Sequence, residues 1–191
     1  MANPKLKTKE AELIEKLKSG DPDAVAQMYN ANVDRVYSLV FNQVDRDHEA
    51  AQEIVQEAFL AAVKSVKYFH GRSSIFTWLC SIANRKVADF YRRKKREAKH
   101  RADYAVEPEQ VQDIDESAVS LAESAESNAA IRQVLSSLPL HYRQALVLKY
   151  VEGFSVSEIS EIMVRSQKSI EGLLTRARKE LQAKLATQSE G

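Results

Sequence analysis

Two clusters of positively charged side chains are the residues of this chain whose types and spacing could do chemistry. Nine Lys or Arg lie between Arg85 and Arg101, five of them consecutive from Arg92 to Arg96, and a second run is Arg176-Ala177-Arg178-Lys179. Cations packed this closely repel one another, so stabilisation of the fold is a poor explanation for them. Binding of an anionic partner explains their clustering better. The alternative is a solvated helix end, where Lys and Arg also suit the helix dipole.

An aromatic loop precedes the first cluster. Tyr68, Phe69 and Trp78 flank the segment Gly71-Arg72-Ser73-Ser74. Aromatic side chains beside a basic surface can stack on unpaired bases. The alternative is that Trp78 and Phe76 are core residues. The pattern of the loop alone therefore leaves both alternatives open.

The sequence carries no pattern typical of an enzyme. It has no paired catalytic carboxylates, nucleophile motif or Gly-rich phosphate loop. The four histidines and the single cysteine, Cys80, lack metal-ligand spacing. Cys80 lies in the apolar run Trp78-Leu79-Cys80-Ser81-Ile82 and is expected to be a small buried residue. We therefore expect a non-enzymatic protein that needs no cofactor or metal.

The expected location is the cytoplasm. One cysteine allows no internal disulfide and fits a reducing compartment. No stretch approaches the ~18 apolar residues of a membrane span, so no membrane insertion is expected. Residues 1–20 are rich in Lys and Glu and lack the apolar core of a signal peptide.

The composition favours an all-α fold, so we expect helices to position the basic clusters and the aromatic loop. Hydrophobic residues make up 44% of the chain and charged residues 29%, with 5 Gly and 4 Pro. No window alternates apolar and polar residues strictly enough to predict a strand. The balanced net charge of +1 averages over blocks of opposite sign.

Residues 8–97 are predicted to form the first domain, a bundle of long helices. Asp21-Pro22 is a cap followed by Pro at the first helical position. A second helix follows the polar stretch 45–48, and Ser73 or Ser74 can cap a third. The expected inward residues are Val25, Tyr29, Val33, Val36, Val40 and Val44; then Ala51, Ile54, Val55, Ala58, Phe59, Ala62 and Val66; then Ile75, Trp78, Leu79, Ile82, Val87 and Phe90.

Residues 98–124 are predicted to be a flexible acidic linker. From Ala102 to Ile131 there is no Lys or Arg, while eight Asp or Glu occur, with Pro108 among them. Large aliphatic residues are sparse in this stretch, which is typical of a segment without a core.

Residues 125–187 are predicted to form a second domain of four helices that contains a helix-turn-helix. Pro139 can begin a helix that Gly153 stops, and Ser155 with Glu158 fits a capping box. A short capped helix, a polar turn and a longer basic helix then follow, as in a helix-turn-helix. The last helix presents polar and basic side chains outward, namely Gln167, Lys168, Ser169, Glu171, Thr175, Arg176, Arg178 and Lys179.

Taken together, these segments resemble the extracytoplasmic-function (ECF) group of bacterial sigma-70 factors. In the first domain the resemblance rests on Glu53-Ile54-Val55-Gln56-Glu57-Ala58-Phe59 and on the run from Tyr68 to Leu79. In the second it rests on Leu138-Pro139, on Glu152-Gly153-Phe154-Ser155, and on Ser169-Ile170-Glu171 ahead of the last basic run. Each motif is weak alone, but both sets occur in order on either side of a short acidic linker.

The resemblance implies a role for each cluster in directing RNA polymerase to promoters. Docking on the polymerase is assigned to Glu53, Gln56, Glu57 and Phe59. Capture and melting of the −10 element are assigned to Phe69, His70, Gly71, Arg72, Ser73, Ser74, Arg85, Lys86, Asp89, Arg92 and Arg93. Reading of the −35 element is assigned to the outward residues of the last helix.

The resemblance also implies the partners. They are promoter DNA and the core RNA polymerase, through the clamp helices of its largest subunit and the flap of its second-largest subunit, with one copy of the chain in the holoenzyme. In this family a membrane-anchored anti-sigma factor often clamps the two domains, and nothing in the sequence identifies one. The acidic linker is implied to run through the polymerase channels.

The sequence departs from the family pattern at several positions. Acidic residues are usual at the positions of Ala50 and Gln52, so we expect weaker docking on the polymerase or a need for a compensating signal. Ala50→Asp with Gln52→Glu should then change the affinity for core polymerase. The usual Asn of the −10 helix falls at Arg85, with Asn84 beside it. Val164 replaces a common turn Gly, and Glu171 could accept from cytosine N4 or merely reduce charge density.

The alternative interpretation is a stand-alone helix-turn-helix regulator with an N-terminal effector or dimerisation domain. Such a protein would bind palindromic operators tightly by itself and would not associate with polymerase. An effector domain has no need of the aromatic loop or of the Arg92–Arg96 run.

Overall fold

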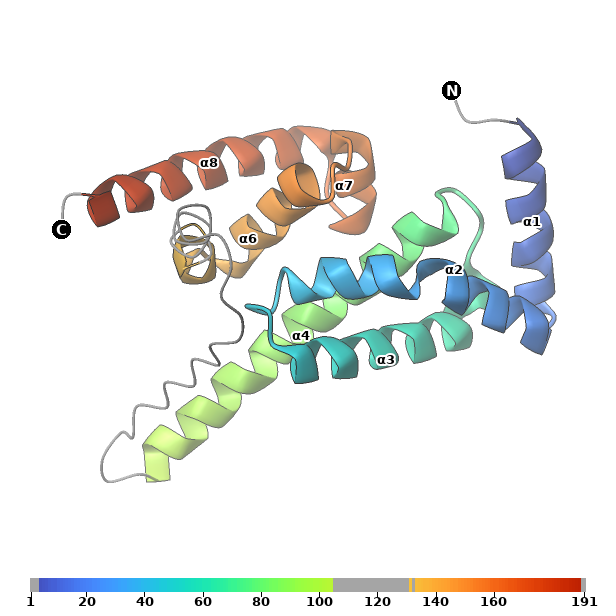
Figure 1. The fold of residues 1–191 in the computed structure, drawn as a ribbon, viewed down its shortest axis with the longest axis horizontal. Coiled ribbons are helices and arrows are strands. Elements are labelled where there is room, and N and C mark those ends of the chain that lie inside the picture. Colours follow the sequence, from blue (N-terminus) through green and yellow to red (C-terminus); the bar gives the residue numbers. More distant parts are fainter. Residues whose placement is uncertain (1–3, 105–130, 132, 190–191) are drawn as a thin grey trace, which may run out of the picture.

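The computed structural model describes residues 4–104, 131 and 133–189, and all regular structure in these residues is helical (Figure 1). Those helices form two units, one on each side of residues 105–130. The all-α prediction is confirmed. The predicted acidic linker falls largely on residues 105–130, which lie outside the described residues.

The first unit consists of α1 (Pro4–Lys18), α2 (Pro22–Phe41), α3 (His48–Ser65), the short 3₁₀ turn η1 (Val66–Tyr68) and α4 (Ile75–Tyr104). The carboxylate of Asp21 caps α2 by accepting from the backbone N–H groups of Asp23 and Ala24, and Pro22 opens the helix, as expected. Asp47 caps α3 in the same way. Helix α4 continues to Tyr104, past residue 97 where the sequence placed the end of the domain.

Helices α2, α3 and α4 pack on one another around the main core, while α1 covers α2 and η1 (Figure 1). All seven residues of α3 and η1 that the sequence predicted to point inward are buried. Helix α2 differs: Val36 and Val40 are buried, whereas Tyr29 is 44% exposed and Val25 and Val33 are half-buried. The apolar stripe of α2 is therefore divided between the core and an open surface.

The second unit consists of a helical turn at 131 and 133–137, α6 (Leu140–Leu146), the π-helical turn η2 (Val147–Val151), α7 (Val156–Ile162) and α8 (Gln167–Ser189). The predicted capping box is present: the Ser155 hydroxyl accepts from the Glu158 N–H, and the Glu158 carboxylate accepts from the Ser155 N–H. Helices α6 and α7 both pack on the inner stripe of α8.

The two units share a buried interface. Leu39 of α2 and Cys80 of α4 belong to the same apolar cluster as Leu148, Phe154 and Ile159 of the second unit. Cys80 is fully buried, as the sequence predicted, and burial raises the pKa of its thiol to about 12. Cys80 therefore contributes to the apolar packing between the two units.

A buried arginine joins the units beside this cluster. Arg143 of α6 is 5% exposed, and its Nη1 donates to the Asp45 carboxylate at 2.9 Å, to the Tyr91 hydroxyl at 2.8 Å and to the Gln43 carbonyl at 3.2 Å. Its Nε donates to the Leu135 carbonyl at 3.1 Å, which ties it to its own unit. The guanidinium thus connects four segments of the chain.

The turn between α7 and α8 offers a test of backbone strain. Val164 has φ +53°, which is a left-handed backbone conformation. Its side chain is 72% exposed, so side-chain packing does not offset the backbone strain. That conformation costs an L-residue roughly 1–2 kcal/mol, more than the ~0.5–1 kcal/mol of extra chain entropy that Gly brings. Val164→Gly should therefore raise the free energy of unfolding by about 0.5–1 kcal/mol, measured by urea denaturation.

The matched control is Gly153→Ala, at φ +74°, where an added Cβ meets nothing within 4 Å. It should lower the free energy of unfolding by about 1 kcal/mol through the backbone alone. If both substitutions moved stability in the same direction, the strain argument would be wrong.

Candidate nucleic-acid and protein-docking surfaces

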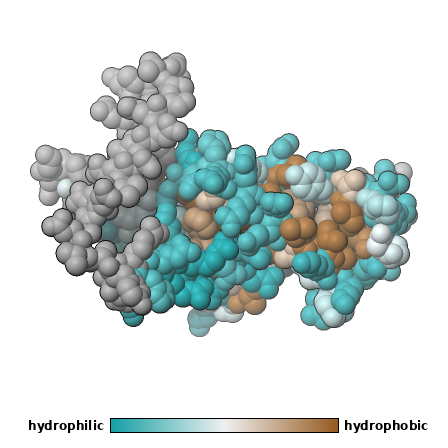
Figure 2. All heavy atoms as spheres, turned by 90° about the horizontal axis from the view of Figure 1, so that it is seen from below, coloured by the Kyte–Doolittle hydropathy of each residue, from teal (hydrophilic) through white to brown (hydrophobic). Residues whose placement is uncertain are grey.

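An apolar groove lies between α2 and α3. It has a volume of about 670 Å³, and among the residues lining it are Val25, Tyr29, Val33, Gln56, Phe59, Leu60 and Val63. Leu60 is 54% exposed, Val63 41% and Tyr29 44%. Figure 2 shows hydrophobic side chains gathered on the face of the first unit seen from below Figure 1. An open apolar surface of this kind is typical of a protein-docking site.

The polymerase-docking residues expected from the sequence divide between two faces of α3. Gln56 lines the groove, and Phe59, only 6% exposed, forms its floor in edge-to-face contact with Tyr29 at 4.9 Å. Glu53 and Glu57 turn instead toward α4. Tyr29 was missed as a site because it follows the period of a core stripe. Leu60 and Val63 lie off the predicted inward stripe of their helix, so their apolar side chains on an outward face were the signal that could have found the groove.

The two positions where acidic residues are usual in the family differ in exposure. Ala50 is 4% exposed and belongs to the core, whereas Gln52 is exposed at the groove. A carboxylate at position 50 would be buried. Only Gln52 is therefore a sound position for restoring a surface charge.

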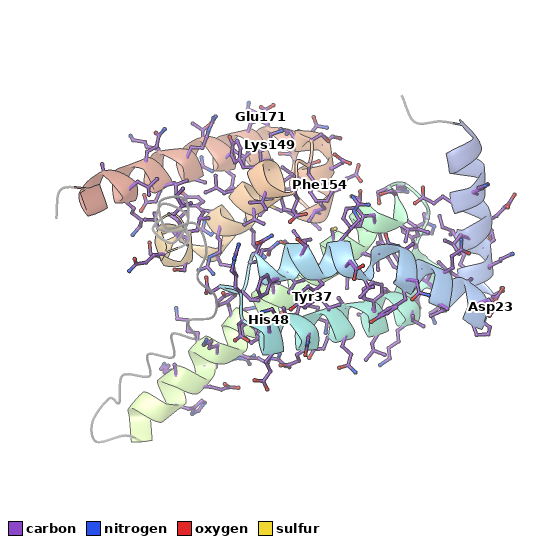
Figure 3. All side chains as sticks on the ribbon, viewed as in Figure 1. Asp23, Tyr37, His48, Lys149, Phe154 and Glu171 are labelled. Carbon is purple, nitrogen blue, oxygen red and sulfur yellow. The ribbon has the colours of Figure 1, made fainter. Side chains whose placement is uncertain are left out.

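One end of the groove is fixed by a hydrogen bond between helices. The Tyr37 hydroxyl lies 2.7 Å from Nδ1 of His48, so that α2 is joined to the start of α3 (Figure 3). Phe41 stacks on the Tyr37 ring and lies tilted against the His48 ring. The bond holds the separation of the two helices that line the groove.

The basic face of α4 lies next to α3. A groove of about 810 Å³ is lined by Lys86, Arg92, Arg93, Lys95, Arg96 and Lys99 together with Glu57 and Asp89. Lys86 pairs with Glu57 at 3.0 Å, and Arg93 pairs with Glu53 at 3.0 Å and with Glu57 at 3.5 Å. Arg92 pairs with Asp89. The carboxylates expected to dock polymerase are therefore counter-ions of cations expected to bind DNA.

The loop that precedes α4 runs from residue 69 to 74. Phe69 is 7% exposed and stacks on Trp78 with ring centroids 4.6 Å apart, so it anchors the loop and does not present its ring to solvent. His70 and Arg72 are exposed. Ser74 proves to be the capping residue, its hydroxyl accepting from the Thr77 N–H at 3.0 Å.

A hollow of about 460 Å³ opens beside this loop. The second unit lines it with Glu161 of α7, and the first unit lines it with residues that include Tyr68, Phe69, His70, Arg72, Ser73 and Trp78. Tyr68 is 69% exposed. An aromatic wall with serine and arginine side chains suits an unpaired base. Glu161 is the residue through which the second unit lines this hollow.

The outer face of α8 is open. Gln167, Lys168, Glu171, Thr175, Arg176, Arg178 and Lys179 are exposed, and Ser169 is half-buried. Glu171 points away from the rest of the molecule (Figure 3). Gln167 donates to the Ser157 hydroxyl at 3.2 Å, which joins the start of α8 to α7. The face has the polar N-terminal turn and the later cations that a recognition helix needs.

Within the described residues there is no group of His, Cys, Asp and Glu that could hold a metal ion. Among the same residues, no helix is both long enough and apolar enough to span a membrane.

Comparisons with known proteins agree on one family. The sequence matches the family model of ECF sigma factors over residues 7–187. The ECF RNA polymerase sigma factor SigW of Bacillus subtilis is 32% identical over 180 residues, covering 90% of this chain and 94% of SigW.

Two solved structures have a similar fold. One is CnrH in complex with the cytosolic domain of CnrY, with a TM-score of 0.65 and 21% identity, covering 93% of this chain and 97% of CnrH. The other is the sigma factor RpoE of Bartonella quintana in complex with the anti-sigma factor NepR, with a TM-score of 0.62 and 20% identity, covering 84% and 96%.

The ion pairs on the basic face lead to a salt-dependence prediction. Glu57→Gln removes a carboxylate that contacts both Lys86 and Arg93. The free chain should then bind an oligo-dT strand more tightly, and its log–log salt slope should steepen by up to ~0.7 for each released cation. Fluorescence anisotropy at several salt concentrations measures both quantities.

Glu49→Gln is the control, because it makes the same charge change at an exposed position in the first turn of the same helix. Equal changes of slope in the two variants would show that net charge alone is responsible and would contradict the prediction.

Proposed function

The chain belongs to the family of ECF sigma factors, and we propose that it binds core RNA polymerase and directs the enzyme to promoters through two DNA-binding surfaces. The observation that supports this best is the pairing of an open apolar groove with an adjacent basic helix in one unit, and an open recognition face in the other. A stand-alone regulator is not favoured, because the family match spans both units.

Docking on the polymerase is assigned to the groove between α2 and α3. Its exposed Leu60, Val63 and Tyr29 offer apolar area to a helical partner, and Gln52 and Gln56 offer polar contacts at its edge. An amphipathic helix laid in a groove is a common recognition mode. The clamp helices of the largest subunit are the proposed occupant, and the flap of the second-largest subunit is the proposed partner of the second unit.

The −10 element is assigned to the hollow beside residues 69–74 and to the basic face of α4. Unstacking a base step costs a few kcal/mol, and capture of the extruded base in an aromatic pocket offsets part of that cost. Trp78 and Tyr68 supply the aromatic wall, while Arg85 and Arg92 lie further along α4 for the phosphates.

The −35 element is assigned to α8, which would enter the major groove. The Gln167–Glu171 turn would face base edges, and Arg176, Arg178 and Lys179 would face phosphates. Arg176 lies along the helix, its Nη1 3.4 Å from where a Cβ at position 172 would be, so Gly172 leaves it room.

The two units must separate for both elements to be contacted at once. The −10 and −35 elements lie about 25 base pairs apart, which is about 85 Å of duplex at ~3.4 Å per base pair. In the closed arrangement Glu161 of the second unit and the loop of the first line one hollow. The ~26 residues of 105–130 can span about 90 Å when extended, enough to allow this separation.

A regulator of the anti-sigma class is a further proposed partner. The solved structure of RpoE holds such a protein. In this chain the docking groove and the faces that meet between the two units are the surfaces for which a regulator would compete with polymerase.

Run-off transcription tests the proposed function. Core RNA polymerase is incubated with fragmented genomic DNA of the host, with and without the chain, and the transcripts are sequenced. Discrete new start sites should appear only when the chain is present. Tight binding of the free chain to duplex DNA, with no new transcript and no association with core polymerase, would contradict the proposal.

Substitutions in the groove test the docking surface separately. Leu60→Ala should weaken the affinity for core polymerase about tenfold or more, because a buried Leu side chain contributes ~1.5–3 kcal/mol. Its 54% exposure means that the fold is not at risk. Gln52→Glu should act in the opposite sense and strengthen binding.

Lys64→Ala is the control, since Lys64 lies on the same helix, is exposed and does not line the groove. Surface plasmon resonance against immobilised core polymerase measures all three variants. An unchanged affinity of Leu60→Ala would remove the groove from the docking surface.

A further inference from the structure

Helix α1 lies against the loop of residues 69–74, beside a hollow other than the aromatic one. Ile14 and Leu17 anchor it in the main core. A second hollow, of about 550 Å³, separates the exposed part of α1 from the loop and is lined by Glu10, Glu15 and Lys18 on one side and residues 70–74 on the other. The loop is thus held between α1 and the aromatic face of α4.

One hydrogen bond joins α1 directly to the end of the loop. The backbone N–H of Ile75, the first residue of α4, donates to Oε1 of Glu10 at 2.6 Å. Carboxylates are favoured at helix N-termini, where unpaired N–H groups and the helix dipole attract negative charge. Helix α4 therefore has two caps, the local Ser74 hydroxyl and a carboxylate from the N-terminal helix.

A second contact supports the middle of the loop. Gly71 has φ +65°, and a Cβ built there would lie 3.6 Å from Cδ1 of Ile14. The loop therefore rests on α1 at Gly71 and at Ile75. On its other side Phe69 is held by the ring of Trp78. These contacts fix the start of the loop at Phe69, its middle at Gly71 and the residue that follows it, Ile75.

We propose that Glu10 is a positioning residue for base capture: it sets the conformation of residues 69–74 before DNA arrives. The inference rests on the proposed role of this loop at the −10 element. A loop that is already ordered loses less entropy when it closes on a ligand.

Trp78 provides a direct reporter of this loop. It is the sole tryptophan of the chain, and its ring stacks on Phe69, the first residue of the loop. Glu10→Ala should change the emission maximum of Trp78 and its quenching by acrylamide, in the full chain without DNA. Glu10→Gln keeps an oxygen acceptor for the Ile75 N–H and should restore the spectrum of the unaltered chain.

The second measurement uses the holoenzyme on a template that gives a run-off transcript. Glu10→Ala should lower the fraction of promoter opened, measured by permanganate reactivity, about tenfold, as expected for one lost hydrogen bond to a charged group. Its affinity for core polymerase should not change. Glu10→Gln should recover most of the opening.

Glu15→Ala is the matched control. It removes the same charge from the same helix and the same hollow, but Glu15 pairs only locally, with Lys18 at 3.0 Å. It should leave both measurements unchanged. Circular dichroism confirms that each variant retains its helices.

The outcomes separate the inference from the proposed function. An unchanged Trp78 signal in Glu10→Ala, or unchanged promoter opening despite an altered signal, overturns the positioning role. Failure of the unaltered chain to open any promoter overturns the proposed function instead, and the Trp78 comparison of Glu10→Ala with Glu10→Gln still decides whether Glu10 sets the loop.

Discussion

The buried guanidinium of Arg143 governs how the two helical units sit together. Its partners are the Asp45 carboxylate, the Tyr91 hydroxyl and three backbone carbonyls, those of Gln43, Leu135 and Ser136. A buried charge that loses a partner destabilises a protein by about 3–5 kcal/mol. The position of Asp45 is itself held at a backbone cost, since Asp45 and Arg46 both have positive φ. Burial and the neighbouring Asp45 carboxylate raise the pKa of Tyr91, which keeps its hydroxyl protonated as a donor.

The same interface contains groups that favour its opening. Both amide atoms of Gln43 and the Oδ1 of Asn84 are buried without a partner among the described residues. Each such group costs about 1–3 kcal/mol, which water would remove on separation. Glu152, whose carboxyl pKa is raised by burial, would also be solvated. The apolar cluster around Cys80 opposes these effects. Unpaired buried polar groups that favour opening and an apolar cluster that favours closure therefore act against each other at this contact, as the proposed separation of the units requires.

The signals that predicted the structure correctly are local in the chain. The Asp21-Pro22 cap, the Ser155–Glu158 box and the buried face of α3 each follow from residues within one or two helical turns. The groove was not predictable, because the period of an apolar stripe shows that a face is apolar and not what covers it. Nor were Arg143 with Asp45 or Glu10 with Ile75 predictable. These partners are 98 and 65 residues apart, and one sequence carries no sign of such pairs.

The hollow beside the loop links closure of the units to the proposed capture of a base. Glu161 lines that hollow in the closed arrangement, so an extruded base and the second unit compete for one space. The free energy that holds the units together is therefore subtracted from that of DNA binding. If the polymerase binds the separated form more tightly, docking supplies the free energy needed to part the units, and the affinity for DNA rises.

The carboxylates of α3 add to this coupling, because a partner that engages Glu53 and Glu57 releases Lys86 and Arg93. Exposed pairs of this kind are worth less than about 1 kcal/mol and exchange easily. On the proposed function, weak DNA binding by the free chain and stronger binding on the polymerase would have the same physical origin.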